Sequence, residues 1–140
     1  MTNCVFCGIV EGSLKSYRVY ENQSCYAFLD TSPITVGHTL VVPRVHALTL
    51  PDLDDSSVCS LFRTVARLAP FVVKATQSDG FRLIQNNGEA AAQVIGHVHV
   101  HIVPMKRGQS GLLRGRLSLS DEQMESVSKA IVREIGSSPV

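Results

Sequence analysis

The stretch of sequence that decides the fold is Gly96-His97-Val98-His99-Val100-His101-Ile102-Val103-Pro104. Histidines and β-branched apolar residues alternate in it, and a β-strand sends successive side chains to opposite faces. The alternation therefore predicts a strand with three imidazoles on one face and three core residues on the other. Pro104 has no N–H to donate and is predicted to end the strand. One histidine on a sheet is often only a half-buried polar residue, but three in register favour chemistry.

The composition is that of an ordinary globular protein. The chain has 140 residues, of which 44% are hydrophobic and 18% charged, and its formal net charge is +1. This length suits a single domain (residues 1–140) with a core of its own. The balanced charge predicts no polymeric nucleic-acid partner, and no apolar run approaches the length that a membrane span requires. Because no signal peptide is evident, we expect a cytoplasmic protein whose cysteines are thiols or metal ligands.

Five short segments rich in β-branched and aromatic residues predict strands, at 17–21, 25–29, 38–42, 80–85 and 98–103. The first two are separated by Asn22-Gln23-Ser24, which is typical of a hairpin turn. Gly37 and Pro43 bound the third strand. The fold class expected is α+β, with a mainly antiparallel sheet of about five strands, one long central helix and a C-terminal helix.

The helices are predicted from apolar residues at helical spacing. The long one covers about 54–77, and Pro70 should kink or split it. The C-terminal helix opens at the capping box Ser120-Asp121-Glu122-Gln123. Its expected apolar side consists of Met124, Val127, Ile131, Val132 and Ile135. A short helical turn is predicted over 4–12 and ends at Gly12.

The three alternating histidines admit two chemical interpretations. An imidazole that attacks phosphorus needs one free, neutral nitrogen and a partner that holds the other. Three imidazoles could instead bind a catalytic zinc ion with an open coordination position. Side chains on one face of a straight strand recur at about 7 Å, twice the rise per residue, so they form a row that is difficult to close around one ion. We favour the nucleophile and keep the zinc site as the alternative.

Cys4 and Cys7 have the Cys-x-x-Cys spacing that lets two thiolates reach one tetrahedral ion. The same spacing occurs in redox motifs and by chance, so free thiols remain the alternative to zinc. Cys25 and Cys59 have no partner at such a spacing and are interpreted as small hydrophobic residues.

The triad and its surroundings resemble the signature of the histidine triad (HIT) superfamily of nucleotide hydrolases and transferases. The matching elements are the His-x-His-x-His run, the preceding Asn86-x-Gly88 and Gln93, Phe28-Leu29-Asp30-Thr31-Ser32-Pro33, and Gly37-His38-Thr39-Leu40-Val41-Val42-Pro43. The resemblance covers about residues 4–105 and implies an α+β meander that usually dimerises so that two sheets join. The segment 106–140 varies among family branches and contains no functional motif that we can interpret.

The resemblance implies roles for the histidines and a metal site. His99, in the middle of the triad, matches the nucleophile that forms a covalent nucleotidyl-histidine, and His101 matches the partner of the reacting phosphate or leaving group. His38 matches a histidine that converges on the same site. In zinc-bearing bacterial members, positions matching Cys4, Cys7, His46 and His97 hold one structural zinc ion per chain.

The resemblance also implies a nucleotide site. Asp30 matches a carboxylate that binds ribose hydroxyls, although an aspartate before Ser-Pro is also a common turn cap. Asn86 matches a residue that orients the nucleotide or the nucleophile, and Gln93 one that contacts the phosphate or leaving group. An apolar slot for a purine is predicted from Phe6, Phe28 and Leu29. Val94 departs from the Ser or Thr that often follows the glutamine, so any phosphate contact there must come from backbone amides.

The function predicted is hydrolysis at a nucleoside 5′-phosphoryl centre through His99. The substrate would be a purine nucleotide or nucleotide conjugate, cleaved as by a phosphoramidase or a dinucleoside polyphosphate hydrolase. The alternatives are a nucleotide-binding regulatory module with weak turnover and a nucleotidyl transferase. We expect a homodimer, with the helix over about 54–77 at or near the interface, and no membrane partner.

Overall fold

The computed structural model describes residues 3–109, 115–138 and 140. In chain order the longer elements are α1 (Val5–Glu11), β1 (Arg18–Glu21), β2 (Cys25–Leu29), β3 (Thr39–Pro43), α2 (Asp55–Ala75), β4 (Gly80–Ile84), β5 (Val100–Met105) and α3 (Asp121–Ile135). Two short 3₁₀ turns, η1 (Leu50–Asp52) and η2 (Glu89–Ala91), lie in the connections. The strands form one sheet in the order β1-β2-β3-β5-β4, and all neighbouring strands are antiparallel. The predicted fold class is therefore confirmed.

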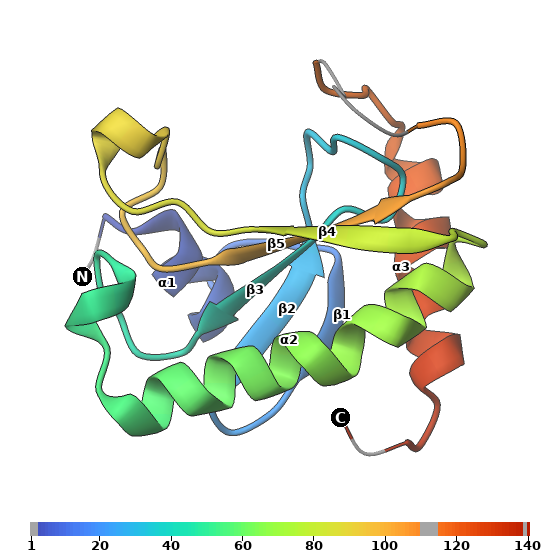
Figure 1. Ribbon diagram of the computed structural model, residues 1–140. Coiled ribbons are helices and arrows are strands. Elements are labelled where there is room, and N and C mark those ends of the chain that lie inside the picture. The colour runs from blue at the N-terminus through green and yellow to red at the C-terminus, as the bar shows by residue number, and fades with distance from the viewer. Residues whose placement is uncertain (1–2, 110–114, 139) are drawn as a thin grey trace.

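The strand register gives the sheet two different faces. Phe28 lies opposite Leu40, and Leu40 lies opposite His101, so these three side chains share one face. Val41 and Val100 are the next residues along these two strands. They face the opposite way and pack in the main core beneath α2 and α3. Helix α2 runs along the strands on that side, with α3 beside its C-terminal end (Figure 1). The other face is thereby left for α1 and the histidines.

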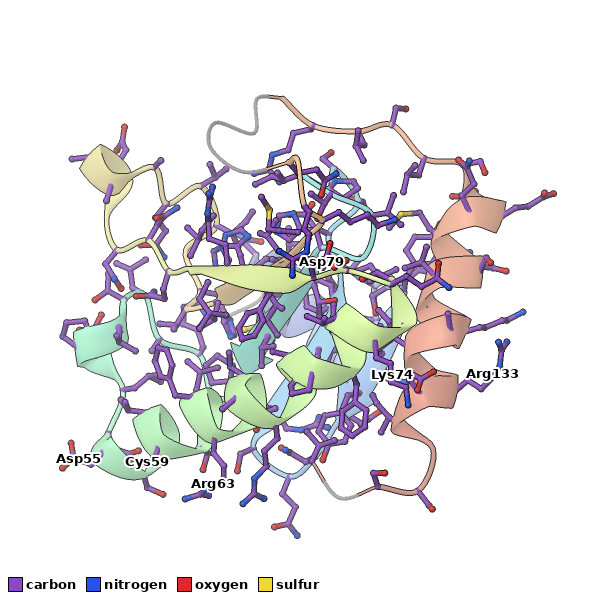
Figure 2. The ribbon with its side chains drawn as sticks, turned by 45° about the vertical axis from the view of Figure 1, so that its right-hand side comes forward. Asp55, Cys59, Arg63, Lys74, Asp79 and Arg133 are labelled. Atoms are coloured by element: carbon purple, nitrogen blue, oxygen red, sulfur yellow. The ribbon has the colours of Figure 1, made fainter. Side chains whose placement is uncertain are left out.

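Helix α2 shows how one apolar stripe anchors a long helix. Its N-cap is Asp54, whose side chain accepts a hydrogen bond of 2.7 Å from the Ser57 N–H. Leu61, Leu68 and Val72 are fully buried against the sheet. Asp55, Cys59 and Arg63 point away from the sheet (Figure 2). The helix is therefore amphipathic and is positioned by its packing.

Pro70 does not split α2, so that part of the prediction was wrong. The helix continues without a break from residue 55 to residue 75. Pro70 lies on the exposed side, where water can satisfy the carbonyl that loses its N–H partner. The buried neighbours Leu68, Ala69 and Val72 hold the helix against the sheet on both sides of the proline.

By length and composition alone, α2 is apolar enough to cross a membrane. The expectation that no apolar run reaches such a length was therefore wrong. The apolar residues of α2 form the stripe that packs on the sheet, which is the normal arrangement of a core helix. Arg63 and Arg67 lie on its exposed side.

The strand that carries the triad begins and ends later than predicted. β5 starts at Val100, so His97 and His99 precede its paired part. The reason is that β3 ends at Pro43, whose carbonyl accepts a 2.8 Å hydrogen bond from the His97 ring rather than from a backbone N–H. Val98 N–H instead donates to the Ala47 carbonyl. The alternation of faces still holds, because Val98, Val100 and Ile102 pack in the main core, whereas His97 and His99 contact Phe6 on the other face.

The far end of β5 passes through Pro104 and stops at Met105. Thr39 and Ile102 form the last pair between β3 and β5, so Pro104 lies beyond the ladder on that side and its missing N–H interrupts no bond. In α3 the predicted capping box is present at Ser120 and Gln123. Val132 does not belong to the buried side of α3, because its side chain is 47% exposed.

Candidate functional site

A cavity of about 520 Å³ lies on the sheet face opposite α2. Its apolar wall consists of Val5, Phe6, Ile9, Phe28, Leu40 and Ile95. Its polar side includes Lys15, Asp30, Asn86, His99, His101 and Arg116. The walls come from α1, from the shared row of β2, β3 and β5, and from the segments that precede and follow β5. The cavity thus combines an apolar slot with convergent polar groups, as ligand sites do.

His99 is held in one tautomer by the backbone. Its Nδ1 lies 2.7 Å from the carbonyl oxygen of His97, and a carbonyl can only accept, so Nδ1 carries the proton. The nitrogen left without a proton is Nε2 when the ring is neutral. Burial lowers the pKa of His99, which favours that neutral state at physiological pH. The edge-to-face contact with Phe6, at 5.1 Å between ring centroids, supports the orientation of the imidazole.

His38 and His101 form a second ordered pair. The Ile34 N–H donates to Nδ1 of His38 at 2.9 Å, so neutral His38 carries its proton on Nε2. This Nε2–H points at Nδ1 of His101, also at 2.9 Å. His101 must then carry its own proton on Nε2. The chain of donors ends in the Nε2–H of His101, which lines the cavity together with His99; the two ring centroids are 5.0 Å apart.

The pKa values of this pair are strongly lowered. Burial, and after it the proximity of His38, lowers the pKa of His101 to about 4. Burial also lowers the pKa of His38 to about 4, against the opposing effect of the Asp30 carboxylate. Both imidazoles are therefore neutral near pH 7, as the hydrogen-bond chain requires.

Asp30 has two functions in the turn between β2 and β3. Its Oδ1 accepts the Ser32 N–H at 2.8 Å, which is the turn-capping role that the sequence allowed. Its Oδ2 lies 3.6 Å from Nε2 of His38 and 3.2 Å from Nη1 of Arg116. The turn closes at Gly37, whose φ of +92° favours glycine, and a Cβ at that position would collide with Cγ2 of Thr76.

The loop before β5 is stabilised by hydrogen bonds of a side-chain amide group. Asn86 borders the cavity. Gln93 does not line it: its Nε2 donates to the carbonyls of Leu48 and Ile95, and its Oε1 accepts the Gly88 N–H. The structure therefore uses Gln93 to hold the loop in shape rather than to line the cavity. Val94 does line the cavity, with 87% of its side chain exposed.

Cys4, Cys7, His46 and His97 come together at the N-terminal end of α1. Their ligand atoms all lie within 4.8 Å of one another. Sγ of Cys7 is 3.3 Å from Nδ1 of His46 and 3.6 Å from Nδ1 of His97, and Sγ of Cys4 is 3.4 Å from the same His97 nitrogen. Because Nε2 of His97 donates to Pro43, its Nδ1 carries the free lone pair.

The dimensions of this cluster fit a tetrahedral zinc ion. Zinc–sulfur bonds of about 2.3 Å and zinc–nitrogen bonds of about 2.0 Å imply sulfur–nitrogen edges of roughly 3.5 Å, close to the distances observed. Burial and the neighbouring Cys4 raise the pKa of the Cys7 thiol, an effect that a bound cation would reverse. The alternative of a zinc ion held by the triad is not supported, because His97 faces the sulfurs while His99 and His101 line the cavity.

Several residues that line the cavity were not predicted from the sequence. Leu40 could have been found, because period-two counting along 38–42 places it on the face of His38. Lys15 and Arg116 belong to no sequence motif, so neither could be predicted to line the cavity. Leu29, predicted for the apolar slot with Phe6 and Phe28, borders the cavity but packs in the core beneath α2.

The buried histidine pair should make stability depend on pH. An unfolded chain protonates histidine at about pH 6.5, whereas His101 in the folded protein has a pKa of about 4. Between these values the unfolded state binds more protons, so the free energy of unfolding should fall as the pH falls from about 6.5 towards 4. Urea unfolding at several pH values in this range measures the slope.

The matched variant is His101→Gln, which removes one titrating group and keeps an oxygen that can accept from His38. Its slope should be smaller than that of the wild type. Both proteins are measured with the same chelator, so that loss of metal at the cysteine–histidine cluster affects them equally. Identical slopes would contradict the assignment.

Comparison with known proteins identifies relatives over most of the chain. The adenylylsulfatase HINT3 of Arabidopsis thaliana is 40% identical over 131 residues, which are 90% of this chain and 66% of that protein. The chain thus spans about two thirds of that relative's length. The adenosine 5′-monophosphoramidase HNT1 of Saccharomyces cerevisiae is 37% identical over 112 residues, 80% of this chain and 68% of that one.

Solved structures agree with the sequence comparison. A zinc-bound histidine triad family protein from Mycobacterium smegmatis superposes with a TM-score of 0.88 at 31% identity, covering 97% of this chain and 95% of that one. The HIT domain family matches residues 11–108, which contain β1 to β5 and all five histidines. The chain belongs to the HIT domain family.

Proposed function

We propose that the protein is a nucleotide hydrolase that acts at a nucleoside 5′-phosphoryl centre, with His99 as the nucleophile. The observation that supports this most directly is the 2.7 Å bond from Nδ1 of His99 to the His97 carbonyl, which leaves Nε2 as the free nitrogen of a cavity-lining imidazole. The names of two relatives, an adenylylsulfatase and an adenosine 5′-monophosphoramidase, agree with a nucleotide substrate.

The residues around His99 suit the two steps of such a reaction. Nε2 of His99 attacks phosphorus, the bond to the leaving group breaks, and its electron pair departs with that group. The Nε2–H of His101 donates a hydrogen bond to the charge that develops there. Water then attacks the nucleotidyl-histidine, the phosphorus–nitrogen pair returns to Nε2, and one proton is released to solvent. The bond to the His97 carbonyl stabilises the positive charge that the imidazole bears between the steps.

The remaining walls of the cavity suit the nucleoside. Asp30 keeps lone pairs available for ribose hydroxyls, since a carboxylate has about four acceptor positions and the Ser32 N–H and Arg116 use two of them. Phe6 and Phe28, whose centroids are 5.4 Å apart, give the slot an aromatic wall that suits a purine. Asn86 borders the same space.

Replacing His99 with Ala should abolish turnover and leave nucleotide binding largely intact. Loss of a covalent nucleophile costs on the order of 10⁴-fold in rate or more, whereas binding depends on separate contacts. The measurement is kcat/KM for adenosine phosphoramidate and adenylyl sulfate, with AMP affinity by calorimetry. In the wild type, rapid quenching and mass spectrometry should reveal one nucleotidyl adduct that the variant lacks. Wild-type turnover in a pure, folded variant would exclude covalent catalysis at His99 and favour a binding module.

We propose further that Cys4, Cys7, His46 and His97 hold one structural zinc ion. When bound, the ion would tie α1 to the segment that carries the nucleophile, with four protein ligands and no open position. The seven residues of α1 are too few to form a stable helix alone, so such a tie would stabilise the wall that α1 supplies.

About one zinc per chain should copurify, and Cys7→Ser should lose it and unfold at a lower temperature. The free energy of metal binding contributes to folding because the ligands must be ordered to bind. Cys25→Ser is the matched control, since Cys25 is also buried but lies outside the cluster. Elemental analysis and thermal unfolding give the two results. Zinc retained by Cys7→Ser, or zinc lost by both variants, would rule out this ligand set.

A homodimer is the assembly that we propose. In the part of the chain that the structure describes, β4 forms one edge of the sheet and pairs only with β5, and its apolar residues Phe81 and Leu83 are each 45% exposed. An open edge with exposed apolar side chains is normally covered by a partner. A second copy of β4 would extend the sheet, as the family resemblance implies.

Light scattering at micromolar concentration should therefore give the mass of two chains. Leu83→Lys should shift the protein to one chain, because it places a charge at the proposed contact. Val132→Lys is the control, as Val132 is similarly exposed but lies on α3. A wild-type monomer would refute the dimer, and dissociation by both variants would refute the placement at β4.

A further inference from the structure

Arg116 reaches the edge of the cavity from the segment that follows β5. Its Nη1 donates to the Ser32 carbonyl at 2.7 Å and to Oδ2 of Asp30 at 3.2 Å. The next residue anchors the backbone, since the Leu117 N–H donates to the Pro33 carbonyl at 2.7 Å. Residues 115–119 lie beside the turn between β2 and β3 (Figure 1). The guanidinium is thus placed at the cavity by three hydrogen bonds to one turn.

The guanidinium keeps donors for a ligand. Arginine has five N–H donors, and the bonds to Asp30 and Ser32 both use Nη1. Within residues 3–109, 115–138 and 140, no further partner of Nε or Nη2 is found. The side chain is 48% exposed, so these groups are reachable. Lys15 adds a second cation to the cavity lining, against the single carboxylate of Asp30 among the described residues.

The charge of Arg116 lies on the His101 side of the cavity. Its Nη1 donates to Oδ2 of Asp30, which lies 3.6 Å from Nε2 of His38, and that nitrogen is 2.9 Å from Nδ1 of His101. The guanidinium also contributes to the lowered pKa of both His38 and His101. The cation is therefore connected through Asp30 and His38 to His101, the residue proposed to contact the leaving group.

We propose that Arg116 is a specificity-determining residue that favours substrates with an anionic leaving group over substrates with an amine leaving group. The anion would be a phosphate or sulfate joined to the nucleoside 5′-phosphoryl group as an anhydride. This inference rests on the proposed function. Paired N–H groups of a guanidinium match the oxygens of phosphate or sulfate, and charge-assisted bonds of this kind are the strong ones.

The proton balance of the two reactions points the same way. When the phosphorus–oxygen bond of an anhydride breaks, its electron pair leaves on sulfate or phosphate, which is stable at neutral pH without a proton. When a phosphorus–nitrogen bond breaks, the amine must receive a proton from an acid. His101 is largely neutral at pH 7, because its pKa is about 4, so it can donate a hydrogen bond but is seldom available as an acid. A cation beside an anionic leaving group needs no such transfer.

The experiment compares adenylyl sulfate and ADP with adenosine phosphoramidate on the wild type, Arg116→Gln and Arg116→Lys. Arg116→Gln should lower kcat/KM for adenylyl sulfate, ADP or both by about tenfold or more, and that for the phosphoramidate by less than about threefold. Whichever anhydride is affected identifies the anion. Arg116→Lys should keep part of the preference because it keeps the charge. Arg107→Gln is the matched control, since Arg107 is 89% exposed and pairs with Asp79 outside the cavity.

A binding measurement separates this inference from the proposed function. On a His99→Ala background, which is not expected to cleave either ligand, Arg116→Gln should weaken adenylyl sulfate or ADP while leaving AMP nearly unchanged. If the wild type cleaves none of the substrates but this difference in affinity is found, the hydrolase fails and the anion recognition stands. Equal losses for all nucleotides would reduce Arg116 to a support for Asp30, and no loss for any would make it a solvated surface residue. Either result overturns the inference.

Discussion

A buried hydrogen bond from Nε2 of His97 to the Pro43 carbonyl, 2.8 Å long, connects the two halves of the site. It makes Nδ1 the unprotonated nitrogen of His97 and aims it at the cysteine sulfurs. The backbone carbonyl of the same residue accepts the Nδ1–H of His99 and thereby frees Nε2. One residue thus orients both the cysteine–histidine cluster and the imidazole at the cavity. The same bond replaces a rung of the ladder between β3 and β5, so the fold and the site share it.

Much of the fold could be predicted because its elements obey simple periods. The alternation around the triad correctly divided the sheet into a core face and a histidine face, and the cap at Ser120 began α3. The errors have local physical causes. Val98 and His99 left the paired strand because a side chain took the place of a backbone donor, and Pro70 was tolerated because it faces water. Neither effect can be predicted from the hydrophobic periodicity of the sequence or from the helix and strand propensities of its residues.

The residues of the candidate site could be predicted where they belong to a sequence motif. They could not be predicted where only the tertiary structure brings them to the site. The histidines and the two N-terminal cysteines could be identified by type and spacing, and the structure brings them into two clusters. Their tautomers could not, because these depend on the Ile34 N–H and on the His97 carbonyl. Gln93 was predicted to contact the phosphate or leaving group, but its side-chain amide forms hydrogen bonds with three backbone groups. Arg116 lies 86 residues from Asp30, in a stretch without a recognisable pattern.

The contact of the segment after β5 with the turn at Ser32 and Pro33 has an evolutionary consequence. The histidines are held by the sheet, where a change in one strand disturbs its neighbours, so they are hard to alter singly. Residues 115–119, which present Arg116, belong to no strand or helix, and such a connection can lengthen, shorten or change its residues without disturbing the core. Gene duplication followed by drift in such a segment would let descendants diverge in the molecules they accept while inheriting one unchanged catalytic apparatus.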